Sequence, residues 1–135
     1  MGSIYQLMQE FLKKSGIQAN EVGKGKLLFS VNGLNFIFDA NDNDPHFLRL
    51  ALPQINKQGT QVDNIEQQIQ LLNRNYKVAK IVRDHDNSLL ILADAFVYNI
   101  DNFDSLIVRL IQASTDMIND YRKIENNGNG NLQAQ

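Results

Sequence analysis

The sequence predicts an α+β fold in which a single antiparallel sheet is covered by helices on one face. Two hairpins predict the sheet: residues 26–39 alternate apolar and polar side chains around Asn32-Gly33, and residues 78–98 hold two apolar runs around a polar turn. Asn-Gly between alternating segments is a strong hairpin signal, because both residues tolerate the positive φ angles of a tight turn. Three amphipathic segments predict the helices, and the expected order is helix, hairpin, strand, helix, hairpin, helix.

Length and composition favour one domain, which we place over residues 1–124. The chain has 135 residues, of which 43% are hydrophobic and 21% are charged, which suffices for a core. Its formal net charge is -2, so the whole chain lacks the basic footprint of a nucleic-acid binder. A local basic patch stays open as an alternative and would consist of Arg74, Lys77, Lys80 and Arg83. Cysteine is absent, which excludes disulfides and thiolate zinc sites. Residues 125–135 are polar and of low complexity, and we expect this tail to be disordered.

The N-terminal segment predicts a helix over Ser3–Ser15. Ser3 is the expected N-cap, and Gly16 stands where a glycine commonly ends a helix. The apolar residues recur three and four positions apart: Ile4, Leu7, Met8, Phe11 and Leu12. The N-terminus lacks the pattern of a signal peptide, and no segment reaches the roughly 20 apolar residues of a membrane span. We therefore expect a cytoplasmic protein without a membrane partner.

Residues 17–52 predict the first part of the sheet, with three or four strands. A short strand over residues 17–22 precedes the Asn-Gly hairpin, and a polar turn over residues 39–45 follows it. The next strand, His46–Leu52, has one clearly apolar face and ends at a proline. Its alternate residues form two sets: Leu48, Leu50 and Leu52 on one side, and Phe47, Arg49 and Ala51 on the other.

The middle of the chain predicts a second helix and then the second hairpin. Apolar residues three and four apart place the helix over Asp63–Asn75, with Asp63 or Thr60 as its cap. The two strands of the hairpin are expected over Val78–Arg83 and Leu89–Tyr98.

The last helix is predicted to begin at Asp101 or Asn102 and to run for roughly five turns. Its apolar stripe is wide and consists of Phe103, Leu106, Ile107, Leu110, Ile111, Ser114, Met117, Ile118 and Tyr121. One small sheet offers little surface to cover such a stripe, so one hypothesis is a structural homodimer formed through this helix or through the sheet.

The acidic turn partly matches a calcium-binding loop. Asp39, Asn41 and Asn43 occupy the first, third and fifth positions of that pattern. The sixth position should be glycine and is Asp44, and the twelfth should be glutamate and is Leu50. We interpret the segment as a polar turn whose side chains bond nearby backbone donors, and we expect no metal site.

No set of residues indicates a reaction or a cofactor. His46 begins a strand and His85 lies between two aspartates in a turn, so we interpret both as strand-end or surface residues. Asp94 interrupts the apolar run of its strand, which leaves two interpretations. A buried Asp94 would point to a small-ligand or enzymatic pocket around it, whereas an exposed Asp94 would be structural. We favour the exposed position and assign no catalytic residue.

Several aromatic residues lie in predicted strands, namely Phe29, Phe36, Phe38 and Phe47. Such a set would suit a stacking platform for bases if basic residues surrounded it. Because that basic background is missing, we interpret the aromatic residues as core packing and expect no nucleic-acid partner.

The sequence resembles the YbjN family of small bacterial proteins over roughly residues 4–121. The resemblance rests on three segments: the hairpin Phe29–Leu34 with the turn Asp42–Pro45 and strand Phe47–Pro53, then Leu72–Lys80, and then Leu90–Phe96. The family is described as sensory-transduction regulators, and its fold is similar to that of type III secretion chaperones. The resemblance implies no enzymatic activity.

The same resemblance implies a dimer-forming, protein-binding module, chaperone-like or regulatory in role. Such chaperones hold an extended segment of a partner along sheet edges and apolar patches, and an antiparallel sheet with one open face offers such a surface. The expected partners are therefore a protein and a second copy of the chain. The alternative function is the small-ligand or enzymatic pocket near Asp94.

Overall fold

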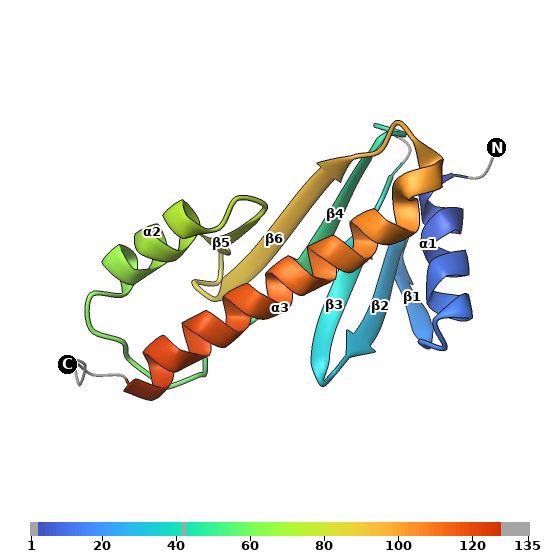
Figure 1. The fold of residues 1–135 in the computed structure, drawn as a ribbon. Helices are drawn as coiled ribbons and strands as arrows, with labels where there is room; N and C mark the ends of the chain where they lie inside the picture. The colour runs from blue at the N-terminus through green and yellow to red at the C-terminus, as the bar shows by residue number, and fades with distance from the viewer. Residues whose placement is uncertain (1–2, 42, 128–135) are drawn as a thin grey trace.

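The computed structural model describes residues 3–41 and 43–127, and it contains one six-stranded sheet with helices (Figure 1). The elements in chain order are α1 (Ile4–Lys14), β1 (Ala19–Gly23), β2 (Lys26–Val31), β3 (Leu34–Asp39), β4 (Phe47–Leu52), α2 (Ile65–Asn75), β5 (Ala79–Arg83), β6 (Leu89–Phe96), the short 3-10 helix η1 (Ile100–Asn102) and α3 (Phe103–Asn127). The predicted α+β fold and the order of its elements are confirmed.

The sheet is antiparallel throughout, with the strand order β1-β2-β3-β4-β6-β5. The Asn-Gly hairpin joins β2 and β3 as predicted. Asn32 and Gly33 both have the positive φ angles of a tight turn, 51° and 82°. From this turn the ladder runs without interruption from the pair Val31–Leu34 to the pair Lys26–Asp39. The turn therefore fixes the register that decides which side chains point to which face.

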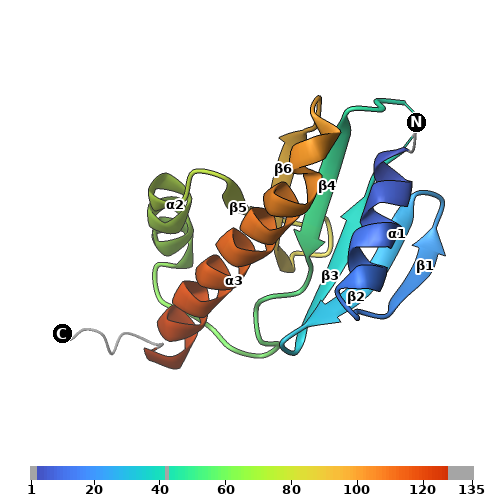
Figure 2. The same cartoon turned by 45° about the vertical axis from the view of Figure 1, so that its right-hand side comes forward.

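One face of the sheet is buried beneath α1 and α3 (Figure 2). The buried strand residues alternate along each strand and include Leu27, Phe29, Phe36, Phe38, Leu48, Leu50, Ile81 and Ile91. The helices contribute Met8 and Leu12 from α1, and Ile107, Met117 and Tyr121 from α3. Three of the four aromatic strand residues are thus core residues, as predicted, whereas Phe47 lies on the opposite face and is half-buried.

The first helix has the predicted ends. The Ser3 hydroxyl accepts a hydrogen bond from the Gln6 N–H, and the Gln6 side chain accepts one from the Ser3 N–H, which forms a capping box. Gly16 follows the helix with a φ of 73°, in the left-handed conformation that favours glycine.

The starts of the other two helices differ from the prediction. Neither Asp63 nor Thr60 caps α2: its N-cap is Asn64, which has a φ of 57° and no side-chain capping bond. Asparagine tolerates this left-handed conformation, so the chain turns into the helix through the backbone of Asn64. Before α3, the Asn99 carboxamide accepts a hydrogen bond from the Asp101 N–H and caps η1, so α3 itself begins at Phe103.

The last helix extends through Asn127, so residues 125–127, which we expected in the disordered tail, are helical. Glu125 explains the extension, because one of its carboxylate oxygens accepts hydrogen bonds from the Tyr121 hydroxyl and the Lys57 N–H. These bonds join the end of the helix to the loop before α2. Residues 128–135 lie outside the described residues.

Helix α2 lies beside β5 and closes that edge of the sheet. The Asn73 carboxamide donates to the Ile81 carbonyl at 3.0 Å and accepts from the Ile81 N–H at 2.7 Å, as a neighbouring strand would do. Lys80 reaches back and donates to the Asn73 carbonyl at 2.6 Å and to the Tyr76 carbonyl. A lysine at the last carbonyls of a helix satisfies acceptors that lack a partner within the helix. Asn73 and Lys80 therefore couple the helix to the edge strand.

We expect Asn73→Ala to lower the free energy of unfolding by about 1–3 kcal/mol, because it leaves the N–H and carbonyl of Ile81 without their partner. Asn75→Ala is the matched control, since Asn75 lies exposed on the same helix. Urea denaturation followed by circular dichroism measures both variants. Equal stability of the two variants would contradict the role of Asn73.

Candidate functional site

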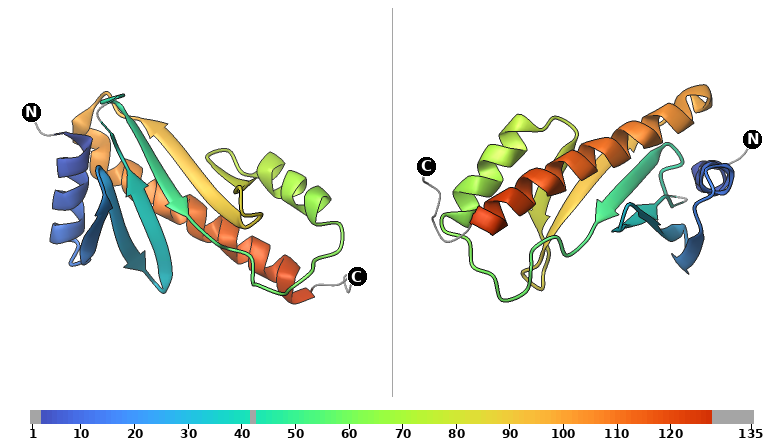
Figure 3. Two further views of the ribbon diagram at one scale, coloured as in Figure 1. Left: turned by 180° about the vertical axis from the view of Figure 1, so that it is seen from behind. Right: turned by 60° about the horizontal axis from the view of Figure 1, so that its bottom comes forward.

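The second face of the sheet carries no helix in the described part of the chain (Figure 3). A row of half-buried residues crosses this open face from strand to strand through register pairs: Leu28 on β2, Ile37 on β3, Ala51 on β4 and Leu92 on β6. None of these four side chains packs against the core cluster. The open face therefore presents an apolar row to its surroundings.

A second row of the open face is charged, and the signs alternate. Register pairs place Lys26, Asp39, Arg49 and Asp94 side by side on β2, β3, β4 and β6. The Arg49 guanidinium donates to both carboxylate oxygens of Asp94, Nε to Oδ1 at 2.8 Å and an Nη to Oδ2 at 2.9 Å. Hydrogen bonding to Asp94 raises the pKa of Arg49, and the charge of Asp39 makes a smaller contribution in the same direction.

Asp94 thus has a structural explanation. Its side chain is 37% exposed and forms a bidentate pair with Arg49, and it does not line the cleft described below. The exposed position that we favoured for Asp94 is confirmed. A polar residue interrupts the apolar run of β6 because its neighbour across the strands, on β4, is an arginine.

The two edges of the sheet are unlike each other. At β5, Asn73 occupies the N–H and carbonyl of Ile81. At β1, no hydrogen bond involves the outward backbone groups of residues 19–23 among those recorded for the described residues. The β1 strand is largely exposed, and Val22 has half of its surface in solvent. An edge strand with free N–H and carbonyl groups is a template for a further strand.

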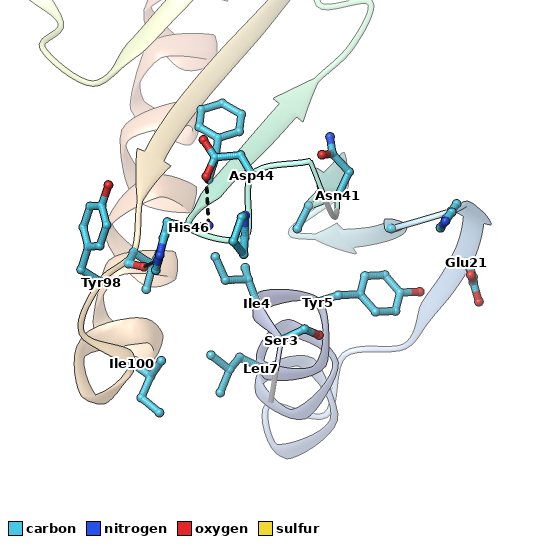
Figure 4. Close-up of a pocket in the computed structure, with 16 residues that line it drawn as sticks. Ser3, Ile4, Tyr5, Leu7, Glu21, Asn41, Asp44, His46, Tyr98 and Ile100 are labelled. Atoms are coloured by element: carbon cyan, nitrogen blue, oxygen red, sulfur yellow. Dashed lines mark hydrogen bonds between the residues drawn. The ribbon is translucent and has the colours of Figure 1, made fainter. Parts of the chain in front are cut away.

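A cleft of about 590 Å³ lies next to the β1 edge, where four segments meet (Figure 4). The start of α1, the β1–β2 turn, the loop before β4 and the segment after β6 form its walls. Most of the lining is apolar and includes Ile4, Leu7, Phe47, Val97, Tyr98 and Ile100, while Glu21, Lys24, Asp44 and His46 supply charged or polar groups. Such a cleft suits an apolar group that enters from the edge of the sheet.

Two polar side chains shape the inside of the cleft. The Tyr5 hydroxyl is buried, and the nearby Glu21 carboxylate interacts with it without a well-formed hydrogen bond. Burial, followed by the charge of Glu21, raises the pKa of Tyr5. On the opposite side, the His46 ring stacks on Tyr98 with 4.5 Å between centroids, and its Nδ1 lies 3.2 Å from the Val97 carbonyl oxygen. The contacts of His46 hold the start of β4 against the segment after β6.

The other candidate residues have local roles. In the acidic turn, Asn41 accepts a hydrogen bond from the Asn43 N–H, and Asp44 accepts one from the His46 N–H, as we expected of a polar turn. His85 is exposed in the hairpin turn beside Asp84. Over the described ranges there is no group of three or more metal-ligating side chains and no helix able to cross a membrane.

Sequence patterns did not indicate the cleft or the difference between the two edges. The cleft is built from four segments that are far apart in the chain, and the pattern of the acidic turn before β4 gives no sign of the other three. A signal existed for the closed edge: Asn73 and Lys80 both lie in the segment that carries the family resemblance, Leu72–Lys80. Their pairing with a strand edge becomes evident only once β5 is known to be an edge.

A scan against models of protein families gives no match, and a search of curated protein sequences gives none either. Among solved structures, the chain is similar to one in the heterodimeric complex ExoU-SpcU from the type III secretion system of Pseudomonas aeruginosa. The TM-score is 0.52 at 15% sequence identity, and the match covers 81% of this chain and 93% of that chain. The likeness is one of fold, and it confirms the predicted type III secretion chaperone-like architecture.

We expect Arg49→Ala and Asp94→Ala each to lower stability only slightly, with a coupling energy below about 1 kcal/mol in a double-mutant cycle. The pair is 42% and 37% exposed, so solvent screens most of its attraction. Urea denaturation of the two single variants and the double variant, at concentrations where the chain is a monomer, measures the coupling. A coupling of several kcal/mol in the monomer would contradict the screening of this pair by solvent.

Proposed function

We propose that the protein is a non-enzymatic, chaperone-like or regulatory module that binds an extended segment of a partner protein. The observation that carries this proposal is the free edge at β1 beside an apolar cleft, while at the other edge Asn73 of α2 bonds both backbone groups of Ile81. A segment added to β1 would gain main-chain hydrogen bonds, and side-chain pockets next to the edge would give selectivity.

The cleft supports an apolar anchor residue in that segment. Glu21 of β1 lines the cleft, so a side chain of an added strand would lie close to its mouth. Ile100 and Tyr98 lie on the far side and are 46% and 75% exposed. Exposed apolar side chains around an apolar cleft are typical of a surface that is covered by a partner.

The wider proposal keeps three further predictions. The chain would be a single domain that acts in the cytoplasm, and it would pair with a second copy. Its resemblance to the YbjN family rests on the segments quoted above, among them Leu72–Lys80, whose Asn73 and Lys80 join α2 to β5.

A second candidate function is the binding of a small, mostly apolar ligand in the same cleft. Its volume lies in the usual range of ligand sites, about 300–1,000 Å³. The buried Tyr5 hydroxyl, which forms no well-formed hydrogen bond within the described residues, would bond one polar atom of such a ligand. Native mass spectrometry of the purified protein distinguishes the two candidates, since a small ligand adds a defined mass below that of any protein.

We expect Ile100→Glu to weaken capture of the partner at least about tenfold, because a carboxylate at the cleft loses hydration when an apolar side chain covers it. Wild-type protein, Ile100→Glu and Val108→Glu are each immobilised and exposed to lysate of the source organism. Val108 is 54% exposed on α3 and does not line the cleft, so its variant is the matched control.

The expected result is a defined protein retained by the wild type and by Val108→Glu but not by Ile100→Glu. Circular dichroism spectra of the three proteins check that each is folded. Equal retention by all three, or no retained protein, would contradict the proposed binding site.

A further inference from the structure

We propose that a second copy of this chain docks on the open sheet face, related by a two-fold axis that runs along the strands between β3 and β4. This inference rests on the proposed pairing of two copies and adds the surface and the orientation. The partner-binding edge at β1 takes no part in it. The argument depends on the order of charges in the row Lys26, Asp39, Arg49 and Asp94.

The order of charges makes the row complementary to itself when it is reversed. Neighbouring strands lie about 4.8 Å apart, so the four residues are evenly spaced across the face. A two-fold axis along the strands reverses the row: Lys26 of one copy then faces Asp94 of the other, and Asp39 faces Arg49 of the other. All four facing pairs have opposite charges, and such complementarity fixes the partner and the orientation.

The same row disfavours a two-fold axis that runs along it. An axis along the row, across the strands, would place Lys26 on Lys26 and Asp39 on Asp39 of the second copy. Like charges that face each other in an interface cost free energy, so this arrangement is disfavoured. The alternating signs therefore select one of the two symmetric ways to stack the sheets face to face.

The apolar row agrees with the same axis. Reversal places Leu28 opposite Leu92 of the second copy, and Ile37 opposite Ala51 of the second copy. Large residues thus meet at the flanks, and a large residue meets a small one near the axis, which suits interdigitation of two sheets about 10 Å apart. These side chains are half-buried and do not pack against the core, so they are available for this contact.

Arg49 can serve both its own chain and the second copy. Its Nε and one Nη bind Asp94 of the same chain, and the other Nη remains for an acceptor on the facing sheet. Covering the pair would also remove it from solvent, which strengthens each of its charge interactions.

The test uses two charge reversals, Asp39→Lys and Arg49→Glu. Each variant alone places like charges opposite each other twice per dimer, so we expect each to be a monomer at concentrations where the wild type is a dimer. Light scattering on a size-exclusion column measures the mass. In a mixture of the two variants, the lysine at position 39 of one chain faces the glutamate at position 49 of the other, so the facing charges are again opposite. We therefore expect a heterodimer. Native mass spectrometry with one variant tagged detects it.

Two further variants keep the result decisive if a reversal impairs folding. The chain that carries both Asp39→Lys and Arg49→Glu restores all facing pairs and is expected to form a homodimer. Ile37→Glu places a carboxylate near the axis in the apolar row and is expected to be monomeric, whereas Val108→Glu, outside this face, stays dimeric. Circular dichroism confirms that each variant is folded.

A wild-type monomer would overturn both the pairing of copies and this inference. A dimer that persists in Ile37→Glu and in the single reversals would overturn the inference alone, because the copies would then meet through another surface. A dimer lost in Ile37→Glu without recovery in the mixture would overturn the orientation. Partner capture through Ile100 is measured separately, so its outcome does not depend on these results.

Discussion

The alternation of side chains along the strands, with its register set by the Asn32-Gly33 turn, is the constraint on which the rest of the structure depends. Because each strand alternates, every second residue is committed to the face beneath α1 and α3, and the others are left on a face that no helix covers in the described part of the chain. The apolar row, the charged row and the half-buried Phe47 are consequences of this division. A one-residue slip would exchange the two faces and lose the core.

The same sheet ends in two different ways, and this difference directs its interactions. Asn73 supplies a donor and an acceptor to β5, so the helix that carries it replaces a further strand. Nothing comparable pairs with β1 in the described residues, and the cleft opens beside it. A covered edge hinders association through β5, and in the proposed function the partner's segment adds to the free edge at β1. The face and the edge point in different directions, so one copy can use both at once.

The sequence was sufficient for the sheet, the order of elements and the burial of Phe29 and Phe36, because those follow from local alternation and turn chemistry. The predicted start of α2 was wrong. Its N-cap is Asn64, which has a left-handed backbone conformation and forms no side-chain capping bond that a sequence pattern could indicate. The exposed position of Asp94 followed from its interruption of an apolar run. The sequence did not predict that Arg49 is the partner of Asp94, because 45 residues separate the two and only the strand order β4-β6 brings them together.

Hydrogen exchange of the backbone amides, with and without the captured partner, tests the central claim most directly. If the partner adds a strand to the free edge, exchange of the amides of residues 19–23 slows on binding, while that of β5 amides such as Ile81, already bonded by Asn73, stays unchanged. Unchanged exchange over residues 19–23, with protection gained elsewhere on the molecule, would contradict binding at β1 and assign the partner to a different surface.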